Sequence, residues 1–178
     1  DEIVALLNDY FEMMVEVLFQ YNGTLDKYVG DEVMALFGVP IENPDAAAAA
    51  VLCAVEMQRA LVEFNQTREA DGQPAVHAGI GVNTGEVVYG AIGSSKAIQY
   101  TVIGDAVNTA SRLCSLAKPN EVICSETTMA LVKGLVTAVE LPKVRVKGKQ
   151  GELTTFSITG LVDGSKPPEL IQERTHPS

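Results

Sequence analysis

The sequence predicts an α+β fold, a sandwich of helices with a mixed or antiparallel sheet, and three observations lead to this prediction. Apolar residues recur at helical spacing in the first 20 residues and in two later segments. Short apolar runs bounded by Gly, Asn and Asp alternate with these helices. Hairpin signals interrupt that alternation, which favours an α+β sandwich over a doubly wound parallel sheet.

Four helices are expected from periodicity and end signals. Asn22-Gly23 should close the first helix with a left-handed cap, and Asn43 should serve as the N-cap of the second, Ala-rich helix. The expected helices cover residues 1 to about 20, the segment from Pro44 to about 68, residues 104 to about 116, and a short stretch after Ser125.

The expected strands are short. Residues 25–37 form a hairpin hinged at Gly30-Asp31, and its second run, 33–37, is apolar without alternation, as in a strand buried on both faces. Residues 76–82 and 86–92 are predicted to form a second hairpin through Asn83-Thr84-Gly85. Further extended segments are expected at 98–103, 122–124, 136–146 and 153–158.

Composition limits the function classes. The 178 residues carry a net charge of −10, which argues against nucleic-acid or anionic-membrane binding but leaves a single nucleotide possible. The three cysteines lack disulfide or zinc spacing, which predicts buried thiols in a reducing compartment. No apolar run is long enough to cross a bilayer, so we expect a cytoplasmic domain without direct membrane contact.

We expect one domain over residues 1–160 and a C-terminal tail or linker over 161–178, where Pro167-Pro168 stands among few apolar residues. The chain opens directly on a helix with a core-facing side. A domain seldom begins in this way, which suggests that a preceding N-terminal strand is lacking.

Two sets of polar residues are candidates for chemistry. Asp31 stands at the mouth of a strand, where a carboxylate can hold a divalent cation against a phosphate, or where Gly30-Asp31 is simply a turn. Asn108 and Arg112 are four residues apart on one helix and form a donor-rich patch suited to sugar and phosphate oxygens. The alternative is a solvated arginine with an incidental asparagine.

Four stretches together resemble the catalytic domain of the class III nucleotidyl cyclases, most closely the bacterial adenylyl cyclases. They are Val29-Gly30-Asp31, residues 81–87, residues 99–113 and Val146-Lys147-Gly148-Lys149, in the family's order and spacing. The resemblance covers residues 1 to about 160. It implies a ferredoxin-like, palm-related sandwich and an enzyme that uses two Mg²⁺ or Mn²⁺ ions.

The resemblance assigns a role to each matching position. Asp31 matches the second of two metal-binding aspartates, and Lys147 the lysine that grips the terminal phosphates. Arg112 matches the arginine that stabilises the transition state at the α-phosphate.

Three further roles follow from the same match. Lys27 and Thr101 match the purine-reading pair, and Asn108 the residue that orients the ribose. In the family the metal site comes from one subunit and the purine, ribose and arginine contacts from the other. A single type of chain is therefore expected to form a homodimer with active sites at its interface.

The chemistry of the two purine-facing residues favours ATP. Adenine presents an acceptor at N1 and a donor at its amino group, which suit a Lys27 that donates and a Thr101 that accepts. Guanine reverses both edges. Many family members carry aspartate where this chain has Thr101, and because a hydroxyl can also donate, discrimination is expected to be looser. The expected reaction converts ATP to 3′,5′-cyclic AMP and pyrophosphate.

The sequence departs from the family at its beginning. No residue matches the first metal-binding aspartate, because Asp1, Glu2 and Asp9 are helix residues. Without that metal ligand, the chain by itself can be inactive even if a longer protein is not. A non-catalytic dimerisation or signalling domain descended from a cyclase is therefore an alternative. A guanylyl cyclase is a further alternative. A diguanylate cyclase is another, although Val29 stands where that family's hairpin has its first glycine.

Overall fold

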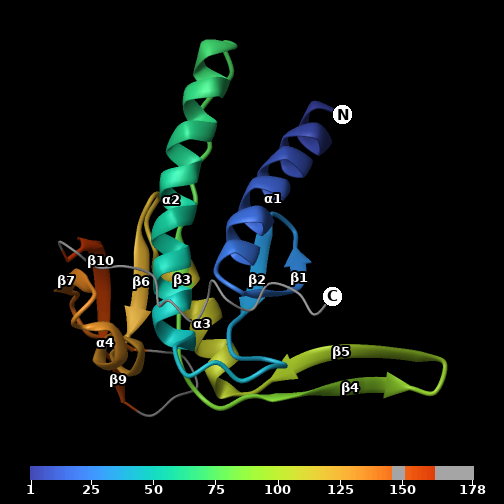
Figure 1. Cartoon of the computed structure of the whole chain (residues 1–178), viewed down its shortest axis with the longest axis vertical. Helices are drawn as coiled ribbons and strands as arrows, with labels where there is room; N and C mark the ends of the chain where they lie inside the picture. Colours follow the sequence, from blue (N-terminus) through green and yellow to red (C-terminus); the bar gives the residue numbers. More distant parts are fainter. Residues whose placement is uncertain (146–150, 163–178) are drawn as a thin grey trace, which may run out of the picture. The chain divides into compact units, whose positions relative to one another are not determined.

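The computed structural model describes residues 1–145 and 151–162, which fall into two compact units. The first unit comprises Asp1–Val76, and the second lies within His77–Ser165. Figure 1 labels most of the helices and strands of both units. Residues 146–150, which include the family-matched Lys147, and residues 163–178 of the predicted tail lie outside the described residues.

The first unit packs two helices with a two-stranded ribbon. Val17, Leu18 and Cys53 form one cluster of its buried core, and apolar side chains of the ribbon pack against them. At the end of the first helix, Asn22 adopts φ 58° and the Gly23 amide donates to the Leu18 carbonyl at 3.0 Å, as predicted for a left-handed cap. The elements are α1 (Glu2–Gln20), β1 (Thr24–Val29), β2 (Glu32–Leu36) and α2 (Ala46–Ala70).

The second unit is built on a mixed sheet with the strand order β3-β6-β10-β7. The pair β3 and β6 is parallel, and β10 runs antiparallel to both β6 and β7. A separate hairpin joins β4 to β5, and a short ribbon joins β8 to β9. The elements are β3 (Ile80–Val82), β4 (Val88–Ser94), β5 (Ala97–Ile103), α3 (Asp105–Leu116), β6 (Val122–Ser125), α4 (Glu126–Val132), β7 (Val136–Glu140), β8 (Val144–Arg145), β9 (Glu152–Leu153) and β10 (Thr155–Leu161).

The mixed sheet and the four helices confirm the predicted α+β class. One predicted pairing is wrong: residues 76–82 and 86–92 do not form a hairpin. Instead β3 pairs with β6, and β4 pairs with β5. The Asn83-Thr84-Gly85 turn carries the chain out of the mixed sheet, and Asn83 donates from Nδ2 to the Ala106 carbonyl at 2.9 Å.

Smaller details also differ from expectation. Residues 33–36 of β2 are half-buried rather than buried on both faces, since β2 pairs with β1 in a two-stranded sheet. Asp45, not Asn43, is the N-cap of α2, and Asn43 accepts a hydrogen bond from the Asp45 amide at 2.9 Å.

The cysteine prediction is largely confirmed. All three thiols are free, and Cys53 and Cys124 are buried whereas Cys114 is half-buried. Burial raises the pKa of the Cys53 thiol to about 12 and that of Cys124 to about 11, so both stay protonated at neutral pH. No helix among the described residues is long and apolar enough to cross a membrane.

The position of α3 depends on a glycine in the strand beneath it. A Cβ on Gly81 of β3 would overlap the Cys114 amide nitrogen and lie 2.8 Å from the Ala110 carbonyl oxygen. The helix backbone therefore rests directly on the strand. Leu113, fully buried, is part of the same contact region.

Gly81→Ala should destabilise the second unit by about 1–3 kcal/mol, because both close contacts are backbone atoms that cannot move aside by changing rotamer. Urea unfolding followed by circular dichroism measures the change. Gly134→Ala is the matched control, since a Cβ there meets nothing within 4 Å. Equal stability of the two variants would contradict this account of how α3 is seated.

Candidate active site

Helix α3 carries two of the predicted site residues. Asn108 is exposed, and Arg112 stands one turn further along and is half-buried. The Nη1 atom of Arg112 is buried and has no hydrogen-bond partner in the structure. Leaving a buried donor of a charged group unpaired is costly, and an anionic oxygen would remove that cost. The helix thus presents an amide and a guanidinium that lacks an acceptor.

Thr101 lies on β5, the strand that leads into α3, where it is half-buried and pairs with Gly90 of β4. Because side chains alternate along a strand, Thr101 faces away from Tyr100 and the buried Val102. One continuous stretch of chain, from β5 through Gly104 into α3, therefore holds Thr101, Asn108 and Arg112.

Asp31 lies in the two-residue turn between β1 and β2 and is exposed. Gly30 takes φ 61° at the first turn position, a conformation that glycine adopts without the steric penalty of a side chain. The register Val29↔Glu32 fixes both ends of the turn. The carboxylate of Asp31 is thus presented to solvent from a tight turn whose two ends are fixed by strand pairing.

Lys27 belongs to β1, and its Nζ lies 3.6 Å from the Asp26 Oδ2 atom. The lysine side chain is 46% exposed, whereas that of Asp26 is only 3% exposed. Lys27 and Asp31 both lie in the first unit, while Thr101, Asn108 and Arg112 lie in the second.

Asp31 is the candidate metal ligand among the predicted site residues. Mg²⁺ in nucleotide sites is often held by one or two carboxylates together with substrate phosphates. Within residues 1–145 and 151–162, no group of three or more His, Cys, Asp or Glu side chains could hold a metal ion. A single carboxylate such as that of Asp31 fits a divalent cation that is also coordinated by triphosphate oxygens. It does not fit a site in which described side chains supply all the ligands.

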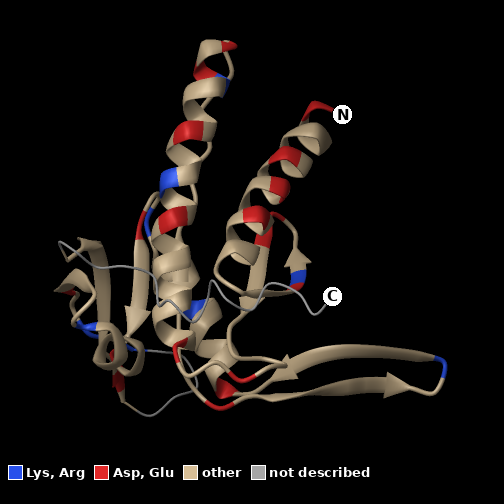
Figure 2. Cartoon of the chain, in the orientation of Figure 1, with Lys and Arg blue, Asp and Glu red and all other residues tan. Residues whose placement is uncertain are grey.

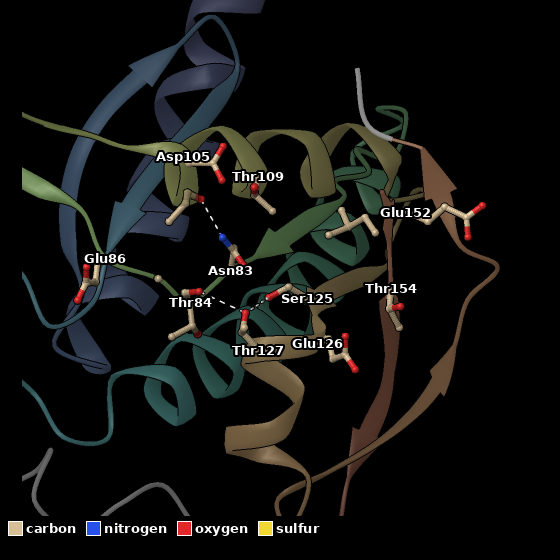
Figure 3. A pocket seen from close by; sticks show the side chains of 13 residues that line it. Asn83, Thr84, Glu86, Asp105, Thr109, Ser125, Glu126, Thr127, Glu152 and Thr154 are labelled. Carbon is tan, nitrogen blue, oxygen red and sulfur yellow. Dashed lines mark hydrogen bonds between the residues drawn. The ribbon is translucent and has the colours of Figure 1, made fainter. Parts of the chain in front are cut away.

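A pocket of about 420 Å³ in the second unit was not anticipated from the sequence (Figure 3). It opens where the parallel strands β3 and β6 end, beside the first turns of α3 and α4. The side chains that line it are mostly hydroxyls and carboxylates: Asn83, Thr84, Glu86, Asp105, Thr109, Ser125, Glu126, Thr127, Glu152, Leu153 and Thr154.

Hydroxyl contacts order the floor of this pocket. Thr84 Oγ1 lies 2.9 Å from Thr128 Oγ1, and Thr127 Oγ1 donates to the Thr84 carbonyl at 3.3 Å. Among the residues that the structure describes, no lysine or arginine lines the pocket. The pocket lies at the end of the parallel pair β3 and β6. The sequence predicts a hairpin at β3 in place of this pairing, and therefore does not predict the pocket.

Comparisons with known proteins agree with this fold and these motifs. Residues 1–160 match the family described as adenylate and guanylate cyclase catalytic domain. Adenylate cyclase 1 from Rhizobium meliloti is 33% identical over 164 residues, which cover 91% of this chain and 25% of that protein. The adenylate cyclase of Anabaena cylindrica is 36% identical over 171 residues, or 88% of this chain and 32% of that protein.

A solved structure shows the same fold. The crystal structure of the guanylyl cyclase Cya2 superposes with a TM-score of 0.86 and 37% identity, covering 92% of this chain and 83% of that one. The chain spans only a quarter to a third of the two curated relatives, 25% and 32% of their lengths. On the family match and these identities, the chain belongs to the class III adenylate and guanylate cyclase catalytic domain family.

Proposed function

We propose that this domain is an adenylyl cyclase that converts ATP to 3′,5′-cyclic AMP and pyrophosphate as a homodimer. The observation that carries the proposal is the pair on α3: Asn108 and Arg112 one turn apart, with a buried Arg112 nitrogen that lacks an acceptor. In a chain of the cyclase family, a nucleotide phosphate is the natural acceptor.

The reaction forms a bond between the ribose 3′-oxygen and the α-phosphorus and breaks the bond to pyrophosphate, while the 3′-hydroxyl proton leaves to solvent. Negative charge grows on the α-phosphate oxygens, and the guanidinium of Arg112 is the group to meet it. The Asn108 amide can hold the ribose so that its 3′-oxygen points at the phosphorus. Lys147, outside the described residues, is proposed to bind the terminal phosphates.

Asp31 would hold Mg²⁺ or Mn²⁺ together with the substrate phosphates, two ions to a site in the family pattern. These cations, when bound, make the 3′-hydroxyl more acidic and neutralise the leaving phosphates. The role of Asp31 itself is to supply a fixed anionic oxygen at the end of a rigid turn.

Adenine is the proposed base because Lys27 donates and Thr101 can accept. Both named curated relatives are adenylate cyclases, whereas the Cya2 structure is that of a guanylyl cyclase. The proposal of adenine therefore rests on the side chains of Lys27 and Thr101 more than on the activity of any one relative. Because ATP is a cytoplasmic metabolite, the proposed reaction places the domain in the cytoplasm.

The β4–β5 hairpin supports the proposed homodimer. Its strands carry no charged residue, and Figure 2 shows a basic residue only at the turn between them. Val88, Ile98, Tyr100 and Ile103 are 64%, 57%, 69% and 53% exposed. Apolar side chains gathered in this way on both faces of a hairpin mark an interaction surface. A second copy of the chain is its proposed partner, because Thr101 on the same hairpin would then border the shared site.

A non-catalytic signalling domain is the second candidate. It is favoured by the absence, among described residues, of a carboxylate cluster that could bind metal without substrate phosphates. Product analysis with Mn²⁺ and either ATP or GTP, on this chain and on one extended upstream, separates the two candidates. Cyclic nucleotide from neither chain would overturn the proposed enzyme.

Arg112→Ala should lower turnover of ATP roughly a hundredfold or more while largely sparing nucleotide binding, because the guanidinium acts on charge that appears in the transition state. Cyclic AMP formation measures turnover, and calorimetry measures ATP binding. Arg59→Ala is the control, since Arg59 is an exposed partner of Glu56 in a surface ion pair. Loss of binding with unchanged turnover of bound ATP would show that the assigned role is wrong.

Lys27→Glu should lower kcat/KM for ATP at least about tenfold and shift the ATP-to-GTP ratio toward GTP, because a donor to adenine N1 becomes an acceptor. Initial rates with each nucleotide give the ratio. Lys133→Glu makes the same charge change at an exposed position at the end of α4 and should leave the ratio alone. An unchanged ratio in Lys27→Glu would remove Lys27 from the purine site.

A further inference from the structure

Asp26 is a carboxylate in an unusual setting, one residue before the proposed purine-reading Lys27. Its side chain is 3% exposed, and its Oδ2 atom has no hydrogen-bond partner in the structure. A buried polar oxygen without a hydrogen bond costs free energy, and a carboxylate costs more than a neutral group. Stability alone therefore gives no reason for an acid at this position.

A β-bulge explains how Asp26 meets Lys27. The register runs from Leu25↔Ala35 directly to Lys27↔Met34, so Asp26 has no partner on β2. In a regular strand, neighbouring side chains point to opposite faces and cannot pair. The extra residue turns the strand locally and brings Asp26 Oδ2 to 3.6 Å from Lys27 Nζ.

The side chains of the Asp26–Lys27 ion pair differ in exposure, and this difference suits ligand binding rather than folding. The lysine end is 46% exposed, whereas the aspartate end is enclosed. The long lysine side chain would otherwise sample many rotamers, and ordering it on binding costs affinity. A fixed, buried negative charge beside Nζ limits those rotamers before the ligand arrives. An ammonium group has three donors, so one pairing with a carboxylate does not exhaust its capacity to donate.

We propose that Asp26 is a positioning residue for the purine site: its buried carboxylate, placed by the bulge in β1, holds the Lys27 ammonium in the orientation that donates to adenine N1. The inference rests on the proposed adenylyl cyclase function and adds a second residue to base selection. Asp26 itself does not touch the nucleotide.

The test uses Asp26→Asn, which keeps the shape of the side chain and removes its charge, alone and combined with Lys27→Met. Asp26→Asn should raise the KM for ATP roughly five- to tenfold, change kcat little and lower the ATP-to-GTP ratio. In the Lys27→Met background the same substitution should have no further effect, because the two residues act as one unit. Glu56→Gln, which removes the acid of a surface ion pair in the same unit, should leave the KM for ATP unchanged.

Kinetics of Asp26→Asn equal to wild type, or an effect that persists in the Lys27→Met background, would overturn the inference. A loss of equal size for ATP and GTP would also overturn it, because a merely structural role predicts that pattern. The melting temperature of each variant shows that it is folded. If the wild type makes no cyclic nucleotide, the proposed function fails, and the dissociation constant for ATP by calorimetry then decides the Asp26 inference by itself.

Discussion

The contact of α3 with β3 at Gly81 is the constraint on which the proposed roles of Asn108 and Arg112 depend. It allows the helix backbone to rest on the strand, with the Ala110 carbonyl 2.8 Å from where a side chain would begin. This close packing fixes where the backbone of Asn108 and Arg112 lies on the strand. In the proposed site, the guanidinium with its buried, unpaired nitrogen is the group that an anionic oxygen would pair with.

The β1–β2 ribbon is organised by two local departures from regular strand geometry. Gly30, with φ 61°, closes the turn that presents Asp31, and the bulge at Asp26 redirects Lys27. Each departure lies beside a charged side chain with a proposed role, the Asp31 carboxylate for cations and the Lys27 ammonium for the base. Irregular backbone positions and proposed functional positions coincide in this ribbon.

Local signals predicted local features well. Helical periodicity and end residues located α1 and α3, and the cap at Asn22 formed as expected. Pairing between distant strands leaves no local trace, and so the turn residues at Asn83 predict a hairpin although β3 pairs with β6. The pocket made by that pairing was missed for the same reason. The burial of Asp26 could not be predicted either, because an Asp-Lys pair in a strand normally points to opposite faces. The site roles came from family motifs, and they stay predictions.

Complementation between two inactive variants tests the shared-site account most directly. Asp31→Ala disables the proposed metal side and Arg112→Ala the proposed phosphate side. When the two variants are mixed and allowed to exchange subunits, half of the dimers should be mixed, and each should hold one intact site. The account predicts recovery of up to about a quarter of wild-type activity. Activity no higher than the mean of the two separate variants would contradict an active site formed by two chains.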